Sequence, residues 1–309
     1  MEDYYDFEDV LIKPNYSRIK SRADVNLKVY LPQMEEPRVP IIASNMVGVG
    51  TPLAAGILNQ RGWLTALRKV YDEDAPGAFR TYGLNDPRIL NAPPQEGWIM
   101  LDVANGYLNA FIEYAVRVRR KHPKAFIIAG NVATPNGALS LWNAGANAVK
   151  VGIGSGGVCT TRIQAGVGVP QFSAVRSVSN ARPSSKYYVI SDGGCRTPGD
   201  VAKAFVAGAD LVMLGSMLSG YEETGLRFYG NASAQAMSID SLEAEYRHPE
   251  GRIVHYDYDR GPLEESLLEI EAGLRSACSY TGSEHPWQLR LASVVPVRRQ
   301  YNHIKGDEY

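Results

Sequence analysis

The stretch that decides the fold is YYVISDGGCRTPGDVAKAFVAGADLVMLG, residues 187–215. It opens with a short apolar run. After a glycine-rich turn comes a segment whose apolar residues recur at helical spacing. Thr197 can cap that helix, and Pro198 suits its first turn. A second apolar run closes the stretch, so it predicts a strand, a helix and a strand in succession.

The same unit occurs earlier in the chain. Residues 134–146, TPNGALSLWNAGA, start with the same Thr-Pro pair and finish with the same Ala-Gly-Ala as residues 197–209. Several of the short apolar runs in the chain are continuous rather than alternating, which is typical of strands buried on both faces of a parallel sheet. The runs lie at residues 40–44, 63–67, 79–84, 98–103, 126–131, 148–152, 187–192 and 211–215.

Eight strands that alternate with helices predict an α/β fold, a (β/α)8 TIM barrel formed by a single domain over residues 1–309. An open doubly wound sheet produces the same alternation and stays the structural alternative. Residues 85–97 contain three prolines and are too short for a full helix. The C-terminal tail, residues 251–309, contains an amphipathic helix at 262–277, which we expect on the outside of the barrel or at a subunit interface.

The composition is that of a soluble globular protein, with 45% hydrophobic and 21% charged residues and a net charge of −1. This charge gives no support for a nucleic-acid or membrane partner. The N-terminus is acidic and lacks the apolar core of a signal peptide, and no apolar run approaches the roughly 20 residues of a spanning helix. The three cysteines are too few and too scattered for a disulfide framework or a zinc site. We therefore expect a cytoplasmic protein with reduced thiols.

Catalytic residues of a barrel lie where strands end and loops begin. The polar and glycine residues that follow the predicted strands are the candidates, namely Asn45, Lys69, Asp102, Asn131, residues 154–159, Asp192 and Gly215.

Cys159 stands in GIGSGGVCTTR (residues 152–162), behind four glycines in six positions. A lone cysteine is usually a small buried hydrophobe. A glycine-rich loop followed by two threonines instead favours a reactive thiol on a loop that also approaches an ion or a phosphate. The sequence leaves both interpretations open and favours the second.

Two further glycine turns follow the last two predicted strands. In one, Asp192 precedes Gly193 and Gly194; the other is LGSMLSG, residues 214–220. Paired turns at these positions commonly build a phosphate site in barrels, and an aspartate at a strand end can accept from ribose hydroxyls. Glu250, in the loop YRHPEGR, is a candidate general acid or base. The chain contains no HExxH, Walker lysine or GxGxxG-helix motif.

Three segments closely resemble the IMP dehydrogenase/GMP reductase family: residues 150–175, residues 190–218 and DVANGY at 102–107. DFEDVLIKP, residues 6–14, resembles the opening of that family. The Cys-Thr-Thr-Arg loop and the segment RFYGNASAQAM, residues 227–237, resemble the reductase branch. There is no room for the regulatory domain that is inserted in most of the dehydrogenases.

The resemblance implies an NADPH-dependent reductive deamination of GMP to IMP and ammonia, in a homotetramer or an octamer. Cys159 would attack C2 of the purine, and Thr161 and Glu250 would handle protons. The resemblance also implies which residues would bind each ligand. For the purine nucleoside monophosphate they are Asp192, Gly193, Gly194, Gly215, Ser216, Asn231, Ala232 and Ser233. For NADPH they are Lys69, Asp102 and Asn131, with Ser276 and Tyr280 from a neighbouring subunit. For a monovalent cation such as K⁺ they are the backbone carbonyls of Gly154, Gly156 and Cys159.

The chain departs from the family pattern at several positions. Val47 stands where the family has an aspartate that faces the cofactor, and Gly157 replaces a loop serine. Asn231 and Ala232 replace Met-Ser, and Pro249 replaces a small polar residue. The alternatives are therefore the same cysteine chemistry on a different purine nucleotide or without hydride transfer, an IMP dehydrogenase, and a catalytically silent nucleotide-binding protein.

Overall fold

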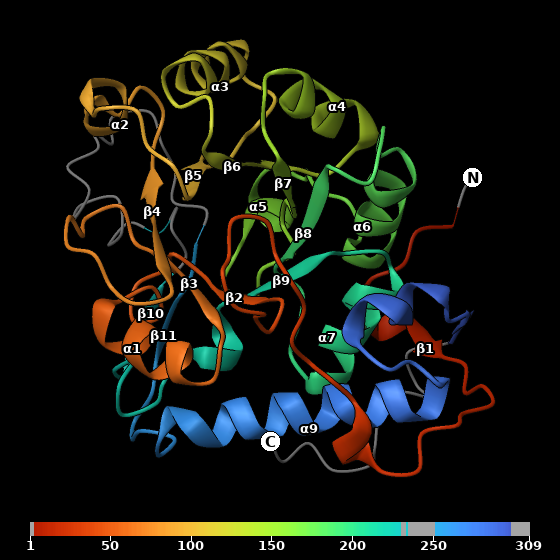
Figure 1. The fold of residues 1–309 in the computed structure, drawn as a ribbon. Coiled ribbons are helices and arrows are strands. Elements are labelled where there is room, and N and C mark those ends of the chain that lie inside the picture. Colours follow the sequence, from red (N-terminus) through yellow and green to blue (C-terminus); the bar gives the residue numbers. More distant parts are fainter. Residues whose placement is uncertain (1–2, 230–232, 234–250, 298–309) are drawn as a thin grey trace.

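The computed structural model describes residues 3–229, 233 and 251–297. Eight parallel strands form a closed barrel in the order β2-β3-β4-β5-β6-β7-β8-β9, and β9 pairs with β2 to close it (Figure 1). This confirms the predicted barrel and excludes the open sheet. The barrel strands are β2 (Ile41–Ala43), β3 (Leu64–Leu67), β4 (Ala78–Tyr82), β5 (Trp98–Asp102), β6 (Phe126–Val132), β7 (Ala148–Val151), β8 (Tyr188–Asp192) and β9 (Leu211–Leu214).

Helices cover the outside of the barrel. They are α1 (Pro52–Gln60), α2 (Pro87–Asn91), α3 (Asn109–Lys121), α4 (Pro135–Asn143), α6 (Gln171–Asn180), α7 (Pro198–Val206) and α9 (Leu263–Thr281). The four-residue α5 (Thr161–Gln164) lies in the connection between β7 and α6 and buries no residue. Outside the barrel, the described chain also contains four 3-10 turns and two pairs of short antiparallel strands. These are η1 (Phe7–Asp9), η2 (Arg22–Asp24), η4 (Pro286–Leu291), β1 (Val10–Ile12) with β12 (Val294–Pro296), β10 (Arg227–Tyr229) with β11 (Ile253–His255), and η3 (Ser216–Leu218).

Local sequence explains why the two similar helices begin where they do. Thr134 and Thr197 accept hydrogen bonds from backbone N–H groups in the first turns of α4 and α7, and a proline follows each threonine. Since the threonine hydroxyl satisfies a donor that the helix leaves open, these pairs fix the two starts.

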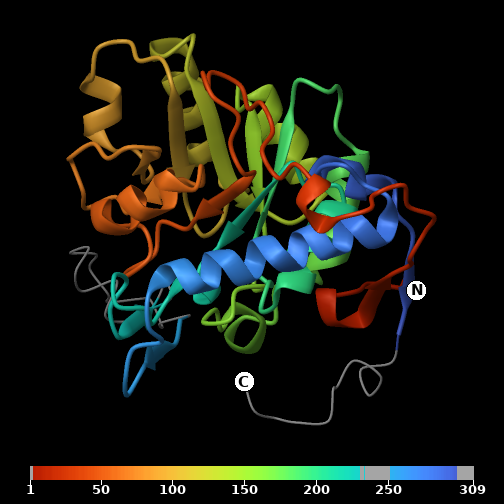
Figure 2. The ribbon, with the colours of Figure 1, turned by 60° about the horizontal axis from the view of Figure 1, so that its bottom comes forward.

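The outer ring differs from an ideal barrel in two places. Residues 68–77, between β3 and β4, form no helix, although all ten are described. The next connection carries only the five-residue α2, as the prolines of 85–97 predicted. The helix expected at 262–277 runs on to Thr281 and packs along α7 between α1 and the N-terminal segment (Figure 2).

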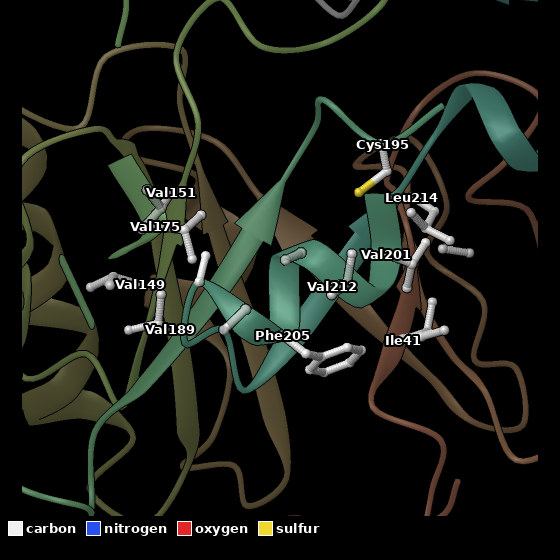
Figure 3. Packing of buried hydrophobic residues seen from close by; sticks show 14 of the residues in the cluster. Ile41, Val149, Val151, Val175, Val189, Cys195, Val201, Phe205, Val212 and Leu214 are labelled. Atoms are coloured by element: carbon white, nitrogen blue, oxygen red, sulfur yellow. The ribbon is translucent and has the colours of Figure 1, made fainter. Parts of the chain in front are cut away.

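The core has two layers. Side chains that point into the barrel fill its interior, including Ile42, Met100, Phe126 and Met213, and Val29 and Leu31 close the amino ends of the strands. Side chains that point outward pack against the helices, as Figure 3 shows for strand valines facing Val175 of α6 and Phe205 of α7. With the interior filled by apolar side chains, polar groups are left to the carboxyl end of the barrel.

Candidate active site at the carboxyl end of the barrel

A buried lysine lies at the centre of the polar groups. Lys150, on β7, is only 2% exposed, and its Nζ lies 2.5 Å from Asp102 Oδ1 and 3.1 Å from Asp192 Oδ2. The two carboxylates come from β8, which neighbours β7, and from β5, which is separated from β7 by β6. A charge buried this deeply requires partners of opposite sign, which the two aspartates supply.

The network continues on both sides of the lysine. Asn45 donates from Nδ2 to Asp102 Oδ2 over 2.9 Å. Asn131 donates to Asp192 Oδ2 over 2.8 Å and to the carbonyl of Gly152 over 2.8 Å. Polar groups from β5, β6, β7 and β8, and from the residue two positions after the end of β2, are thus connected across the mouth of the barrel.

Charge balance in this network keeps Asp102 and Lys150 ionised. Burial raises the pKa of Asp102, but Lys150, the amide of Asn45 and the more distant Lys69 lower it further, so that the net pKa lies below its usual value. Burial lowers the pKa of Lys150, while Asp102 and Asp192 raise it more strongly. At neutral pH the network therefore contains one cation and at least one firmly ionised carboxylate.

The cysteine loop follows β7. Cys159 is half-buried, whereas Cys195 and Cys278 are buried. The Cys159 thiol donates to the hydroxyl of Thr161 over 3.3 Å. Burial raises the pKa of Cys195 well above its usual value and that of Cys278 to about 12, which leaves both inert.

Two further glycine turns, one after β8 and one after β9, lie beside this loop. Gly193 and Gly194 both have positive φ, +86° and +88°, a backbone conformation that favours glycine over residues with a side chain. A Cβ at Gly193 would lie 2.8 Å from Ser155 Oγ and 3.0 Å from the Gly156 nitrogen. A Cβ at Gly157 would lie 3.8 Å from Ser216 Oγ, so the ends of β7, β8 and β9 meet here.

The segment that follows Glu250 returns to the cysteine. Gly251 forms an antiparallel bridge with Cys159, and the Arg252 N–H donates to the carbonyl of Val158 over 2.7 Å. Asn231, Ala232 and Glu250 themselves lie outside the described residues, and Ser233 is fully buried.

Comparison with known proteins identifies the family of the chain. The model of the IMP dehydrogenase / GMP reductase domain matches residues 95–298. The chain belongs to the IMP dehydrogenase/GMP reductase family. Its relatives include GMP reductase 1 of Homo sapiens, 41% identical over 334 residues that cover 97% of this chain and 96% of that protein.

Two further relatives come from distant organisms. GMP reductase of Caenorhabditis elegans is 42% identical over 337 residues, covering 97% of this chain and 94% of that protein. GMP reductase of Escherichia coli is 40% identical over 334 residues, covering 96% of each. All three alignments are longer than the 309 residues of this chain, so these relatives carry segments that it lacks.

The structure brings together most of the predicted site residues of this family member. Asp102, Asn131 and Asp192 are joined through Lys150, and Lys69 lies near enough to Asp102 to lower its pKa. The glycine turns with Gly215 and Ser216 lie beside the cysteine loop.

Ser276 and Tyr280 lie elsewhere, on the outer helix α9. Tyr280 is 64% exposed and lines a hollow with Ile12, Pro14, Ala277 and Thr281. Their contribution to the site of a neighbouring subunit stays a prediction.

Sequence reasoning missed Lys150. The run AVKVG, residues 148–152, predicts a strand buried on both faces. A lysine inside such a strand must have anionic partners, so its charge alone could have marked it. Arg162 and Gln171 were also missed, since their contacts join segments that are far apart in the sequence.

Among the described residues, no cluster of histidine, cysteine, aspartate or glutamate could hold a metal ion. In the same part of the chain, no helix is long and apolar enough to cross a membrane.

Proposed function

We propose that this chain is a GMP reductase, which converts GMP, NADPH and two protons into IMP, ammonium and NADP⁺. The observation that carries the proposal is the placement of Cys159. It is the accessible thiol of the three, it donates to Thr161, and its glycine-rich loop lies beside the two glycine turns that follow β8 and β9. The similarity to GMP reductases over nearly the whole chain supports the same reaction.

The nucleotide is oriented by Asp192 and the glycine turns. Hydrogen bonds within the described residues use Oδ2 of Asp192, so Oδ1 can accept from a ribose hydroxyl. The N–H groups of Gly193, Gly194 and Gly215 with the Ser216 hydroxyl bind the phosphate, whose charge suits such a concave backbone site. Ser233, with Asn231 and Ala232, borders the base.

The chemical step uses the thiol. The Cys159 sulfur attacks C2 of guanine, and the carbon–nitrogen bond to the exocyclic amine breaks as ammonia leaves. The Thr161 hydroxyl, whose oxygen lies 3.3 Å from the Cys159 sulfur, accepts the thiol proton's hydrogen bond before attack and, with Glu250, moves protons to the leaving amine. The backbone bridge between Cys159 and Gly251, the residue after Glu250, supports that pairing.

The cofactor side is formed by Lys69, Asp102 and Asn131. Asp102 has lone pairs beyond those used by Lys150 and Asn45, and it is held ionised, so it suits the ribose hydroxyls of a nicotinamide nucleotide. When bound, NADPH supplies hydride to C2 and thereby releases IMP from the sulfur. Ser276 and Tyr280 of a neighbouring subunit approach its far end in a cytoplasmic homotetramer.

A monovalent cation such as K⁺ fits the cysteine loop. Backbone carbonyls of Gly154, Gly156 and Cys159 are hard oxygen donors of the kind this ion prefers. The Gly156 carbonyl already accepts the Cys159 N–H over 3.0 Å, so one of its two lone pairs remains for the ion.

The first test is turnover of GMP with NADPH in K⁺ buffer, followed by chromatography of IMP. We expect IMP from the wild-type chain, none from Cys159→Ala, and unimpaired turnover in the matched controls Cys195→Ala and Cys278→Ala. Activity that persists in Cys159→Ala contradicts the proposal.

Val47 favours one alternative. The family's aspartate at this position faces the cofactor, and valine cannot accept a hydrogen bond. If GMP binds and protects Cys159 from labelling but is not reduced, the same thiol acts on another purine nucleotide or without hydride transfer.

A further inference from the structure

Arg162 directly follows the Cys-Thr-Thr sequence, and its side chain is bound by Asp6 in the N-terminal segment. Its Nη1 lies 2.7 Å from Oδ2 of Asp6, and its Nη2 lies 3.1 Å from Oδ1. Nη2 also donates to the carbonyl of Val169 over 2.8 Å. Two parallel hydrogen bonds between a guanidinium and a carboxylate fix direction as well as distance.

Asp6 also contacts the start of α6, near the carboxyl ends of β7 and β8. Its Oδ1 accepts the N–H of Gln171, the first residue of α6, over 2.6 Å. Gln171 is fully buried, and its side chain donates to the carbonyl of Val151 over 2.7 Å and to that of Asp192 over 3.3 Å. A single carboxylate therefore connects the cysteine loop to the ends of β7 and β8.

The stem of Arg162 lies between two glycines of the same loop. A Cβ at Gly154 would lie 2.5 Å from Cγ of Arg162, and a Cβ at Gly168 would lie 2.9 Å from it. Gly154 precedes Cys159 in the sequence and Gly168 follows it, and at both positions the absence of a side chain lets the backbone pack against Arg162. The four-residue α5, which begins at Thr161, is too short to hold this loop by its own hydrogen bonds.

Other contacts anchor the N-terminal segment itself. The Tyr5 N–H donates to Ser173 Oγ over 2.9 Å, and Lys203 Nζ donates to the carbonyl of Phe7 over 2.9 Å. Phe7 is buried against Phe172, with ring centroids 6.4 Å apart. The residues on both sides of Asp6 are therefore anchored to the barrel, and Asp6 in turn anchors the cysteine loop through Arg162.

We propose that Asp6 and Arg162 are positioning residues that hold Cys159 in its reactive place, so that the N-terminal segment is a working part of the active site. The inference rests on the proposed function, since it takes Cys159 as the nucleophile. Small displacements of a nucleophile cost large factors in rate, while the nucleotide contacts through Asp192 and the glycine turns remain.

The experiment compares Asp6→Asn with a matched control. Glu271→Gln breaks another bidentate pair, in which Arg61 contacts Glu271 at 3.1 Å and 2.7 Å on the outer helix α9. The two pairs are similarly shielded, with side chains 34% and 24% exposed in the first and 25% and 12% in the second.

We expect Asp6→Asn to lower kcat by about 10- to 100-fold with KM for GMP changed less than about threefold. Alkylation of Cys159 should slow as well, whereas Glu271→Gln should keep both rates within about twofold at a similar loss in Tm. Asp6→Glu, which restores the carboxylate, should recover part of kcat. If Asp6→Asn unfolds, Arg162→Lys replaces it with the same expected loss of labelling.

Equal kcat and equal labelling in wild type and Asp6→Asn would overturn the inference, as would a loss of the same size in Glu271→Gln. Absence of GMP turnover in the wild type would overturn the proposed function instead. The labelling rates of the same proteins would then still decide whether Asp6 positions the thiol.

Discussion

Each end of the barrel contains one buried charged side chain between two partly exposed side chains of the opposite charge, and the signs are reversed between the two ends. At the carboxyl end one cation, Lys150, lies between Asp102 and Asp192. At the amino end one anion, Asp210, lies between Arg182 at 2.7 Å and Arg290 at 2.9 Å.

The difference lies in what remains available to a ligand. Asp210 also accepts the N–H of Val189, and its side chain is only 6% exposed, so both oxygens are committed. Asp102 and Asp192 are 19% and 20% exposed and face the mouth of the barrel. The amino-end cluster therefore stabilises the fold, and the carboxyl-end cluster can bind substrate, in line with the general division of labour between the two ends of such barrels.

The largest effect is expected at the carboxyl end. Lys150→Met leaves two buried carboxylates without their cation, which should destabilise the fold by about 3–5 kcal/mol. It should also reduce GMP turnover by on the order of 10²–10³-fold, since a loss of about 3–4 kcal/mol of electrostatic support corresponds to that factor. Urea unfolding and steady-state kinetics measure the two effects. Lys150→Arg, which keeps the charge, serves as the control, and full activity in Lys150→Met would contradict the assignment.

At the amino end, a substitution should lower stability without lowering turnover. Asp210→Asn leaves two arginines without a full counter-charge and should lower the free energy of unfolding by about 3 kcal/mol. Turnover measured well below the unfolding temperature should stay within about twofold of wild type. A turnover loss as large as that of Lys150→Met would remove the distinction between the two ends.

The pH dependence of stability should reflect the carboxyl-end network. The pKa of Asp102 is lower in the folded protein, so its contribution is present above its unfolded pKa of about 3.9 and is lost as pH falls through the folded pKa. The pKa of Lys150 is raised, so its contribution is full below about 10.4 and is lost as pH rises through its folded pKa.

Asp102→Asn should consequently flatten the fall in stability below about pH 4. Urea unfolding between pH 2 and pH 5 measures this, with the exposed Asp74→Asn as a control for the loss of one carboxylate. An unchanged acid limb in Asp102→Asn would mean that Lys150 does not stabilise the ionised form.

The smallest effect is expected where the tail meets the amino end. Trp287 donates from Nε1 to the carbonyl of Asp210 over 2.7 Å. Trp287→Phe removes that hydrogen bond and should cost about 1 kcal/mol of stability, with turnover unchanged. Thermal unfolding beside a GMP assay measures both, and a change in KM would show that the tail reaches the site within the same subunit.

Much of the barrel could be predicted from the sequence because each strand is a compact apolar run. All eight runs coincide with barrel strands to within one or two residues, and the paired Thr-Pro starts mark α4 and α7. The missing helix at residues 68–77 was not predicted, since the absence of a helix between two strands leaves no positive signal in a chain of short connections.

The site could be predicted in part. Strand ends and glycine turns marked Asp102, Asn131, Asp192 and the Cys159 loop, because their place in the chain already sets their place in a barrel. The sequence did not predict the roles of Lys150, Arg162 and Asp6, because these roles depend on partners 42 to 156 residues away in the sequence. Such partners follow from the closed strand order rather than from any local pattern.

The most direct test of the central claim follows the transferred hydrogen. NADPH carrying deuterium at both C4 positions is incubated with GMP and the chain, and IMP is isolated for mass spectrometry and NMR. The account predicts IMP with one deuterium at C2 in the wild type and no IMP in Cys159→Ala. IMP without deuterium, or labelled IMP from Cys159→Ala, would contradict it.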